Sequence, residues 1–271
     1  MVAALIQARM TSTRLPGKVM RLILGQPMLH WVVERARAIR GVKSIMVIVP
    51  EHPASLPIIH WCLRNAVPCL PGDPEPLSRF AQAVEYLGLK PNDRVMRLTA
   101  DCPILDPRVS EGVLALESDY AGNTRDWPDG LDTEVFTVEA LRATDKLAST
   151  PNDREHVTPF MRAHLLHQEL PLVPPCRELK WSVDTEEELA FVQQVYEVLP
   201  WGFGWEDVLR VKPSDACLLC RTQTPHAQRA RGSIGGPRDY TIWDLHEVEA
   251  SGGAGIAECP AWALHRDGTC S

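Results

Sequence analysis

The chain has 271 residues, of which 45% are hydrophobic and 23% are charged; Lys plus Arg number 28, Asp plus Glu number 35, and the formal net charge is −7. These values exclude disorder throughout the chain and argue against a protein that binds nucleic acid along a basic surface. No run of about 18 apolar residues occurs, and no basic segment precedes the first apolar one, so neither a membrane span nor a signal peptide is predicted and we expect a cytoplasmic protein.

Strands and helices are predicted to alternate along the first 212 residues. Apolar runs predict buried strands at 2–6 and 44–49, and strands are also predicted at 67–70 and 94–99. Amphipathic stretches predict helices at 27–40, 53–66 and 77–87. This alternation is typical of an α/β protein.

A basic loop follows the first predicted strand. It carries Arg9, Arg14 and Lys18, and Pro16 and Gly17 shape its backbone where these cations converge. A basic loop between a strand and a helix, at the carboxyl end of a sheet, is where α/β proteins bind anions, so it predicts a phosphate or nucleotide site. The alternative is a loop of solvated cations. No dinucleotide or P-loop glycine motif occurs there, which argues against those two sites.

Two aspartates are predicted to follow strands farther along the chain. Asp101 comes directly after the strand at 94–99, and Asp184 precedes a helix that begins with a capping-box pattern. A carboxylate at the end of an interior strand needs a partner, and a divalent cation would supply one for both. The alternative for Asp101 is a helix cap, although Asp106 is better placed for that role.

The segment 119–136 is polar and rich in turn residues. A loop of this length in a compact domain is more often functional than idle, so we expect a lid or part of an acceptor pocket, with Asp132 and Glu134 as candidate acceptor ligands. An ordinary surface excursion is the alternative. His156 lies in a helical stretch that opens near Arg154, and taken alone it is more simply a solvated or capping histidine.

Residues 213–271 differ in character from the preceding chain, which places a domain boundary at 212. They contain clustered glycines and few periodic apolar runs, so we expect an irregular or disordered appendage. Cys217 and Cys220 have the spacing of zinc ligands and could build a structural zinc site with Cys259 and Cys270, or with His226, His246 or His265. The second pair lacks that spacing, so a tail of free thiols is the favoured interpretation.

Five motifs occur in order within the first 212 residues. They read Ala-Arg-Met-x-Ser-x-Arg-Leu-Pro-Gly-Lys at 8–18, Thr-Ala-Asp-Cys-Pro-Ile-Leu-Asp-Pro at 99–107, Pro-Asp-Gly-Leu-Asp-Thr-Glu-Val-Phe at 128–136, Arg-Glu-His-Val-Thr-Pro at 154–159 and Val-Asp-Thr-Glu-Glu-Glu-Leu at 183–189. In these motifs the chain resembles the CMP-sugar-acid synthetases, which are cytidylyltransferases that activate acylneuraminates and 3-deoxy-manno-octulosonate. Within that group it is most similar to the spore-coat-polysaccharide branch.

The resemblance implies a fold and a reaction. The fold is glycosyltransferase-A-like, the α/β fold of the nucleotide-diphospho-sugar transferases, a three-layer sandwich with a mostly parallel sheet. The reaction moves CMP from CTP to an acidic sugar, a nonulosonate or an octulosonate, and releases pyrophosphate, in surface polysaccharide biosynthesis. Relatives suggest a homodimer.

The resemblance also assigns residues by their place in the motifs. The expected catalytic residues are Arg9 and Lys18 for the triphosphate and Asp101 and Asp184 for Mg²⁺. The other expected nucleotide-binding residues are Ala8, Arg14 and Thr99. The candidates for holding an acidic acceptor are Arg154, His156 and Arg162.

Two other functions stay open. A glycosyltransferase of the same fold would use a nucleotide sugar as donor, but its usual Asp-x-Asp metal motif is absent at 101–103. A degenerate, non-catalytic binding module is the second alternative. The presence of Arg9, Lys18, Asp101 and Asp184 argues against that loss of activity.

Overall fold

The structure, a computed structural model, describes residues 1–212. The predicted tail with its candidate zinc ligands Cys217, Cys220, Cys259 and Cys270 lies outside the described residues. Among the helices within 1–212, none has the length and apolar character needed to cross a membrane.

A seven-stranded sheet runs through the described part of the chain in the order β5-β4-β1-β6-β8-β7-β9. Its strands are β1 Val2–Gln7, β4 Ser44–Pro50, β5 Cys69–Gly72, β6 Arg94–Thr99, β7 Tyr120–Gly122, β8 Glu134–Thr137 and β9 His167–Glu169. β8 is antiparallel to both of its neighbours, whereas the other neighbouring strands pair in parallel. The prediction of a mostly parallel sheet is therefore confirmed.

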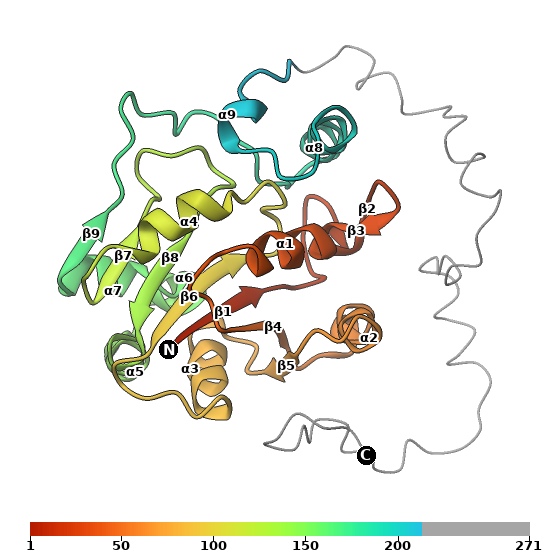
Figure 1. The fold of residues 1–271 in the computed structure, drawn as a ribbon. Helices are drawn as coiled ribbons and strands as arrows, with labels where there is room; N and C mark the ends of the chain where they lie inside the picture. The colour runs from red at the N-terminus through yellow and green to blue at the C-terminus, as the bar shows by residue number, and fades with distance from the viewer. Residues whose placement is uncertain (213–271) are drawn as a thin grey trace, which may run out of the picture. The chain divides into compact units, whose positions relative to one another are not determined.

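Helices cover both faces of this sheet, and Figure 1 shows α1 and α4 on one side and α3 and α5 on the other. The helices of the first face are α1 Met28–Arg37, α2 Leu56–Arg64 and α4 Pro107–Leu114. Those of the second are α3 Pro76–Tyr86, α5 Val138–Leu147, α6 Pro151–His156 and α7 Pro159–His164. The three-layer arrangement expected from the sequence is thus confirmed.

A third apolar cluster lies beyond these layers. Its elements are a small hairpin, β2 Leu22–Ile23 with β3 Gln26–Pro27, and the helices α8 Glu186–Val198 and α9 Trp205–Val208. The short helices η1 Lys18–Met20 and η2 Pro53–Ser55 complete the described elements. α8 begins with the capping box that the sequence indicated, formed by Thr185 and Glu188.

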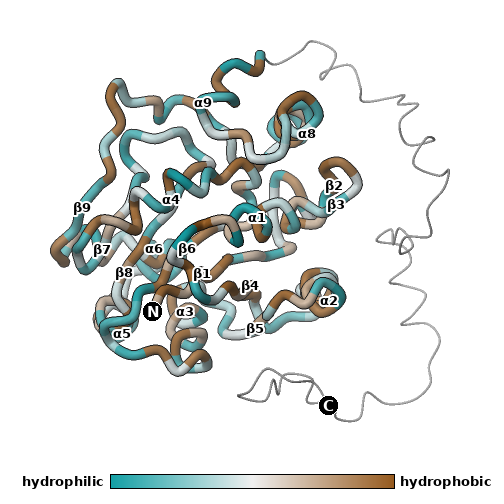
Figure 2. Tube along the Cα trace, in the orientation of Figure 1, coloured by the Kyte–Doolittle hydropathy of each residue, from teal (hydrophilic) through white to brown (hydrophobic). Residues whose placement is uncertain are grey.

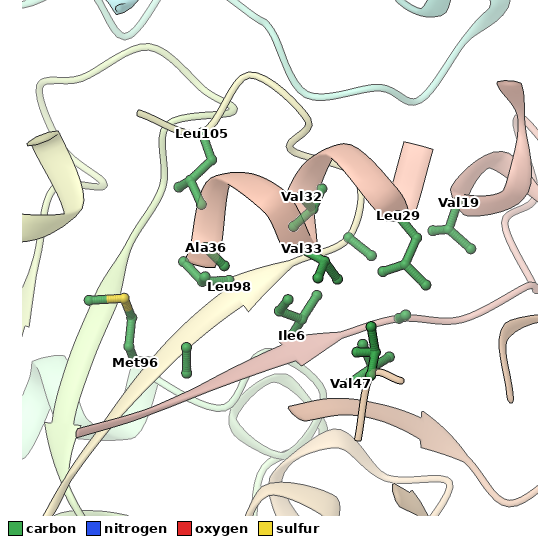
Figure 3. Packing of buried hydrophobic residues seen from close by; sticks show 14 of the residues in the cluster. Ile6, Val19, Leu29, Val32, Val33, Ala36, Val47, Met96, Leu98 and Leu105 are labelled. Carbon is green, nitrogen blue, oxygen red and sulfur yellow. The ribbon is translucent and has the colours of Figure 1, made fainter. Parts of the chain in front are cut away.

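The central strands are apolar on both sides because each face packs against helices. Ala4 and Ile6 of β1 belong to the cluster under α1, while Ala3 and Leu5 belong to the cluster on the opposite face. Figure 3 shows Val33 of α1 above Ile6. β1 and β4 are coloured mainly hydrophobic in Figure 2, as expected for parallel strands buried on both faces.

Two segments differ from the sequence prediction. The segment 119–136 is not a single loop, because β7 and β8 occupy its ends and only residues 123–133 connect them. These strands are short, and they begin with the buried residues Tyr120 and Glu134 instead of the aliphatic run that would have predicted a strand. The segment before Asp184 is not a strand; Lys180 alone forms a parallel bridge, with Asp129.

Candidate active site

A pocket of about 370 Å³ opens where the parallel strands β1 and β6 end. The loop after β1 contributes Arg9, Thr11, Ser12, Thr13, Arg14 and Lys18 to its wall. The other lining residues are Gln7, Val19, Arg97, Thr99, Ala100, Asp101, Glu155, His156 and Asp184. Four cationic side chains and three carboxylates therefore face one cavity.

The loop after β1 is held by its own backbone. The N–H groups of Ser12 and Gly17 both donate to the carbonyl oxygen of Met10, each at 3.0 Å. Gly17 has φ of 68°, a conformation that costs a residue with a Cβ more than it costs glycine, and it leads directly into η1. This turn brings Lys18 back under the loop, where only 9% of its side chain is exposed.

The Lys18 ammonium joins three distant parts of the site. Its Nζ donates to Asp101 Oδ2 at 2.6 Å, to Asp184 Oδ1 at 2.8 Å and to the carbonyl oxygen of Val183 at 2.8 Å. Burial by itself would lower the pKa of Lys18, but the charges and hydrogen bonds of the two aspartates outweigh it and raise this pKa. Lys18 is therefore charged, and all three of its N–H groups are used.

Asp184 receives two further cations. Lys180 Nζ and Arg14 Nη2 both lie 2.8 Å from its Oδ2. Burial would raise the pKa of Asp184, but the hydrogen bonds from Lys18 and Lys180 overcome that effect and hold the pKa at about 2. Asp184 is thus a carboxylate at every pH near neutrality.

Arg9 contacts Glu155 at the rim of the pocket. The distance from Nη1 to Oε1 is 3.0 Å, and about half of each side chain is exposed. Each cation of the loop therefore contacts a carboxylate: Arg9 contacts Glu155, and Arg14 and Lys18 contact Asp184. An anionic ligand would have to exchange with these carboxylates.

The oxygens around Lys18 Nζ are chemically suited to a hard cation. They comprise two carboxylates and one carbonyl, the donor types that Mg²⁺ uses together with substrate phosphates. No group of three or more His, Cys, Asp and Glu side chains in residues 1–212 could hold a metal. These oxygens would supply part of the coordination of a magnesium ion, and phosphate oxygens of a substrate would supply the rest.

The backbone holds the two aspartates together. The Val183 N–H donates to the carbonyl oxygen of Asp101 at 2.8 Å. The N–H groups of Trp181 and Ser182 donate to the carbonyl oxygen of Asp129, at 2.6 and 3.1 Å. The segment that carries Asp184 is thus fastened both to the end of β6 and to the connection between β7 and β8.

Gly130 permits this close approach. Its φ is 110°, and an added Cβ would lie 2.5 Å from the Ser182 nitrogen and 2.6 Å from the Trp181 carbonyl carbon. We expect Gly130→Ala to lower the free energy of unfolding by more than about 2 kcal/mol and to displace Asp184. Urea unfolding measures the first effect. Gly202→Ala is the matched control, because Gly202 also has positive φ, 89°, but no atom lies within 4 Å of its added Cβ. Equal losses in the two variants would contradict the steric argument.

Four residues predicted for the acceptor do not line this pocket. Asp132 pairs with Arg177, and Glu134 is buried against other side chains. Arg154 contacts Glu75, Ser78 and Asp145, and Arg162 contacts Thr124. Ion pairs and hydrogen bonds to neighbouring residues hold these side chains outside the pocket. The linear sequence did not reveal these contacts. Of the acceptor candidates, the structure places His156 in the pocket.

The remaining predicted residues divide between the wall of the pocket and its support. Thr99 and Arg14 line the pocket, whereas Ala8 is buried and does not. Asp106, not Asp101, caps α4 by accepting from the Arg108 N–H at 2.8 Å, as its position in the sequence indicated.

Sequence reasoning missed two charged residues of the pocket, Arg97 and Glu155. Arg97 stands two positions before Thr99 on β6, so the alternation of a strand places both side chains on one face. Glu155 directly precedes His156, a candidate already. Both residues could therefore have been predicted as pocket residues once the strand and the helix had been assigned.

Comparison with known proteins gives consistent matches. Residues 3–198 match the family described as Cytidylyltransferase. The spore coat polysaccharide biosynthesis protein SpsF of Bacillus subtilis (strain 168) is 28% identical over 207 residues, which cover 71% of this chain and 85% of SpsF. The 8-amino-3,8-dideoxy-manno-octulosonate cytidylyltransferase of Shewanella sp. (strain ANA-3) is 33% identical over 121 residues, 45% of this chain and 49% of that enzyme. The chain thus matches only about half the length of this second relative.

Solved structures share the fold. A cytidylyltransferase from Leptospira borgpetersenii serovar Hardjo-bovis (strain JB197) superimposes with a TM-score of 0.71 and 25% identity, over 77% of this chain and 92% of that one. A CMP:2-keto-3-deoxy-manno-octonic acid synthetase, solved in complex with CTP, superimposes with a TM-score of 0.53 and 18% identity, over 72% and 98%. At that lower identity the second likeness concerns the fold alone.

Proposed function

The chain belongs to the cytidylyltransferase family, and on this premise we propose that it transfers CMP from CTP to an acidic sugar of the nonulosonate or octulosonate class. The observation that carries the proposal is the meeting of Asp101 and Asp184 at Lys18 Nζ, in a pocket that also contains Arg9 and Arg14. Carboxylates and basic side chains of this kind bind magnesium and triphosphates in other phosphoryl-transfer sites, which supports the proposal.

The reaction that fits this pocket is an in-line displacement. An acceptor hydroxyl oxygen forms a bond to the α-phosphorus of CTP, the bond from that phosphorus to the bridging oxygen breaks, pyrophosphate leaves, and the hydroxyl proton passes to solvent. Negative charge grows on the phosphate oxygens, and Arg9, Arg14 and Lys18 would neutralise it. Asp101 and Asp184 would hold Mg²⁺, which when bound offsets the charge of the phosphates.

The names of the relatives support the substrate class. One is a spore coat polysaccharide biosynthesis protein, and the other is a cytidylyltransferase for an octulosonate, which is a sugar acid. Surface polysaccharide biosynthesis is the process we propose for this chain.

An assay of pyrophosphate release tests the proposal. The full-length protein is incubated with Mg²⁺, each of CTP, UTP, ATP and GTP, and either N-acetylneuraminate or 3-deoxy-manno-octulosonate. We expect release with CTP and a sugar acid together, and its loss when EDTA removes the metal. A parallel incubation supplies a nucleotide sugar in place of the triphosphate; its consumption would favour a glycosyltransferase, and inertness in both incubations would favour a binding module.

Glu155 is expected to compete with the triphosphate for Arg9. We expect Glu155→Gln to tighten CTP binding by about two- to fivefold, because a half-exposed ion pair is worth at most about 1 kcal/mol. Isothermal titration calorimetry at low ionic strength measures the dissociation constant, and the gain should shrink in high salt. The matched control is Glu139→Gln, which alters an exposed glutamate on α5 outside the pocket. Weaker CTP binding by Glu155→Gln would contradict the competition.

A further inference from the structure

Three polar side chains on neighbouring strands are connected by hydrogen bonds, and two of them line the pocket. Gln7, Arg97 and Glu134 come from the neighbouring strands β1, β6 and β8, and Arg97 stands directly opposite Glu134 in the sheet. Arg97 Nη1 donates to Glu134 Oε2, and Nη2 donates to Gln7 Oε1 at 3.4 Å. Buried charges are unfavourable unless hydrogen bonds or opposite charges satisfy them, so the loss of either hydrogen bond among these three side chains would be costly.

Glu134 is fully engaged. Its Oε1 accepts from the Tyr120 hydroxyl at 2.6 Å and from the Thr158 hydroxyl at 2.6 Å, and Arg162 Nη1 lies 3.5 Å away. Burial would raise the pKa of Glu134, but Arg97 and the two hydroxyls lower it below its usual value. Glu134 is thus a buried, ionised support that does not itself line the pocket.

Arg97 is less completely engaged, and it lines the pocket. Its Nε is buried and has no hydrogen-bond partner, and the bond from its Nη2 to Gln7 is long. Nε and Nη2 form the side edge of a guanidinium, which can bind a carboxylate through two parallel N–H groups. One donor of this edge thus lacks a partner and the other has only a long bond to Gln7, which also lines the pocket and is the contact that a planar anion would displace.

The place of Arg97 separates it from the groups assigned to the triphosphate. Arg9, Arg14 and Lys18 belong to the loop after β1 and to the short helix η1, whereas Arg97 stands within strand β6, where it reaches Glu134 of β8 on one side and Gln7 of β1 on the other. Asp101 follows the same strand and lines the same pocket. A ligand in this pocket would meet the loop cations with its phosphates and Arg97 with a second anionic group.

We propose that Arg97 binds the anionic group of the acceptor, a carboxylate or a phosphonate, and that Glu134 is the positioning residue that holds the guanidinium in place. This inference rests on the proposed function for the identity of the acceptor. It replaces the direct contact with acceptor that the sequence indicated for Glu134: the glutamate acts through Arg97.

The test compares an acid with its neutral ester. The full-length protein is titrated calorimetrically with N-acetylneuraminate, with 3-deoxy-manno-octulosonate and with the methyl ester of each, without CTP. We expect the wild type to bind at least one acid about tenfold more tightly than its ester, since the ester lacks the charge that Arg97 would bind. An acid that binds no better than its ester overturns the inference. A phosphonate analogue of the acid that binds more tightly than the carboxylate would assign the phosphonate as the preferred anion.

Two arginines on β6 supply the variant and its control. Arg97→Lys keeps a positive charge beside Glu134, which protects folding, but removes the two-donor edge. Arg94→Lys makes the same change on the same strand and is the control. Like Arg97, Arg94 has an Nε without a hydrogen-bond partner. Unlike Arg97, it donates to the carbonyl oxygens of Leu114 and Leu116 and does not line the pocket. We expect Arg97→Lys to reduce the acid-to-ester ratio to below about threefold, and Arg94→Lys to keep the wild-type ratio. A wild-type ratio in Arg97→Lys overturns the assignment.

Turnover distinguishes this inference from the proposed function. In the pyrophosphate assay, Arg97→Lys should raise the KM for the sugar acid about tenfold and leave the KM for CTP within about twofold. Glu134→Gln should lower the melting temperature, because Arg97 would lose its buried ion-pair partner, and should raise the KM for the acceptor without changing the KM for CTP. A merely structural role would change both KM values together. A wild type that prefers the acid to its ester but releases no pyrophosphate from CTP would contradict the transfer reaction and leave Arg97 as the anion site.

Discussion

Replacing Asp101 with Asn is expected to slow pyrophosphate release by at least about 100-fold and to leave the protein folded. Asparagine keeps the shape of the side chain but removes the charge that would bind Mg²⁺. Lys18 would still donate to Asp184 and to the carbonyl oxygen of Val183, so it keeps two of its three hydrogen bonds. Steady-state kinetics with CTP and a sugar acid measure the first effect, and circular dichroism with thermal unfolding measures the second.

Asp145→Asn is the matched control for this substitution. Asp145 pairs with Arg154 outside the pocket around Asp101, and 32% of its side chain is exposed, against 30% for Asp101. Because Asp101 and Asp145 have similar exposure and one ion pair each, the difference between them is that only Asp101 lines the pocket. Full activity of Asp101→Asn, or an equal loss in Asp145→Asn, would refute the role assigned to Asp101.

Replacing Lys18 with Met is expected to reduce CMP transfer by about 100- to 1,000-fold, because the ammonium would stabilise the charge that develops on the phosphates. The variant should also gain affinity for Mn²⁺ without nucleotide, since two carboxylates would lose the cation they now share. Electron paramagnetic resonance measures bound Mn²⁺. Lys146→Met changes an exposed lysine in the last turn of α5 and should alter neither property. Retained transfer in Lys18→Met would exclude the proposed role.

The stability of Lys18→Met should depend on pH in a defined direction. The pKa of Asp184 is about 2 in the folded protein, below the value of about 4 for an unfolded chain. A depressed carboxyl pKa contributes stability that is present above the unfolded pKa and is lost as pH falls toward the folded pKa. Because Lys18 is a principal cause of this depression, the difference in unfolding free energy between wild type and Lys18→Met should be largest above about pH 4 and should narrow toward pH 2. Urea titrations from pH 7 to pH 3 measure it; a difference that grows in acid would contradict this assignment.

Local patterns predicted the central part of the fold. The apolar runs that form β1 and β4 are continuous because helices cover both of their faces. The α8 capping box and the Asp106 cap are short-range signals that a sequence displays directly. The predicted strand at 67–70 lies two residues later, at Cys69–Gly72, where Pro71 and Gly72 obscured it.

Long-range pairing explains what the sequence did not reveal. β7 and β8 are short, and the buried charge of Glu134 is stabilised by Arg97, 37 positions earlier, and by the hydroxyls of Tyr120 and Thr158. Asp184 reaches the pocket through hydrogen bonds to Asp101 and Asp129, not through a strand of its own. The motif resemblance placed Asp101 and Asp184 near Lys18, but spacing along the chain could not show that one ammonium touches both.

The reversed direction of β8 has a consequence for redesign. Because β8 runs against its neighbours, residues 123–133 meet the pocket edge of the sheet, and residues 170–182 reach the same edge after β9. The contact of Gly130 with Trp181 and Ser182 joins these two connections. A chimera that takes its acceptor preference from a relative must therefore exchange both connections as a pair, since grafting one alone would leave mismatched partners on either side of that contact.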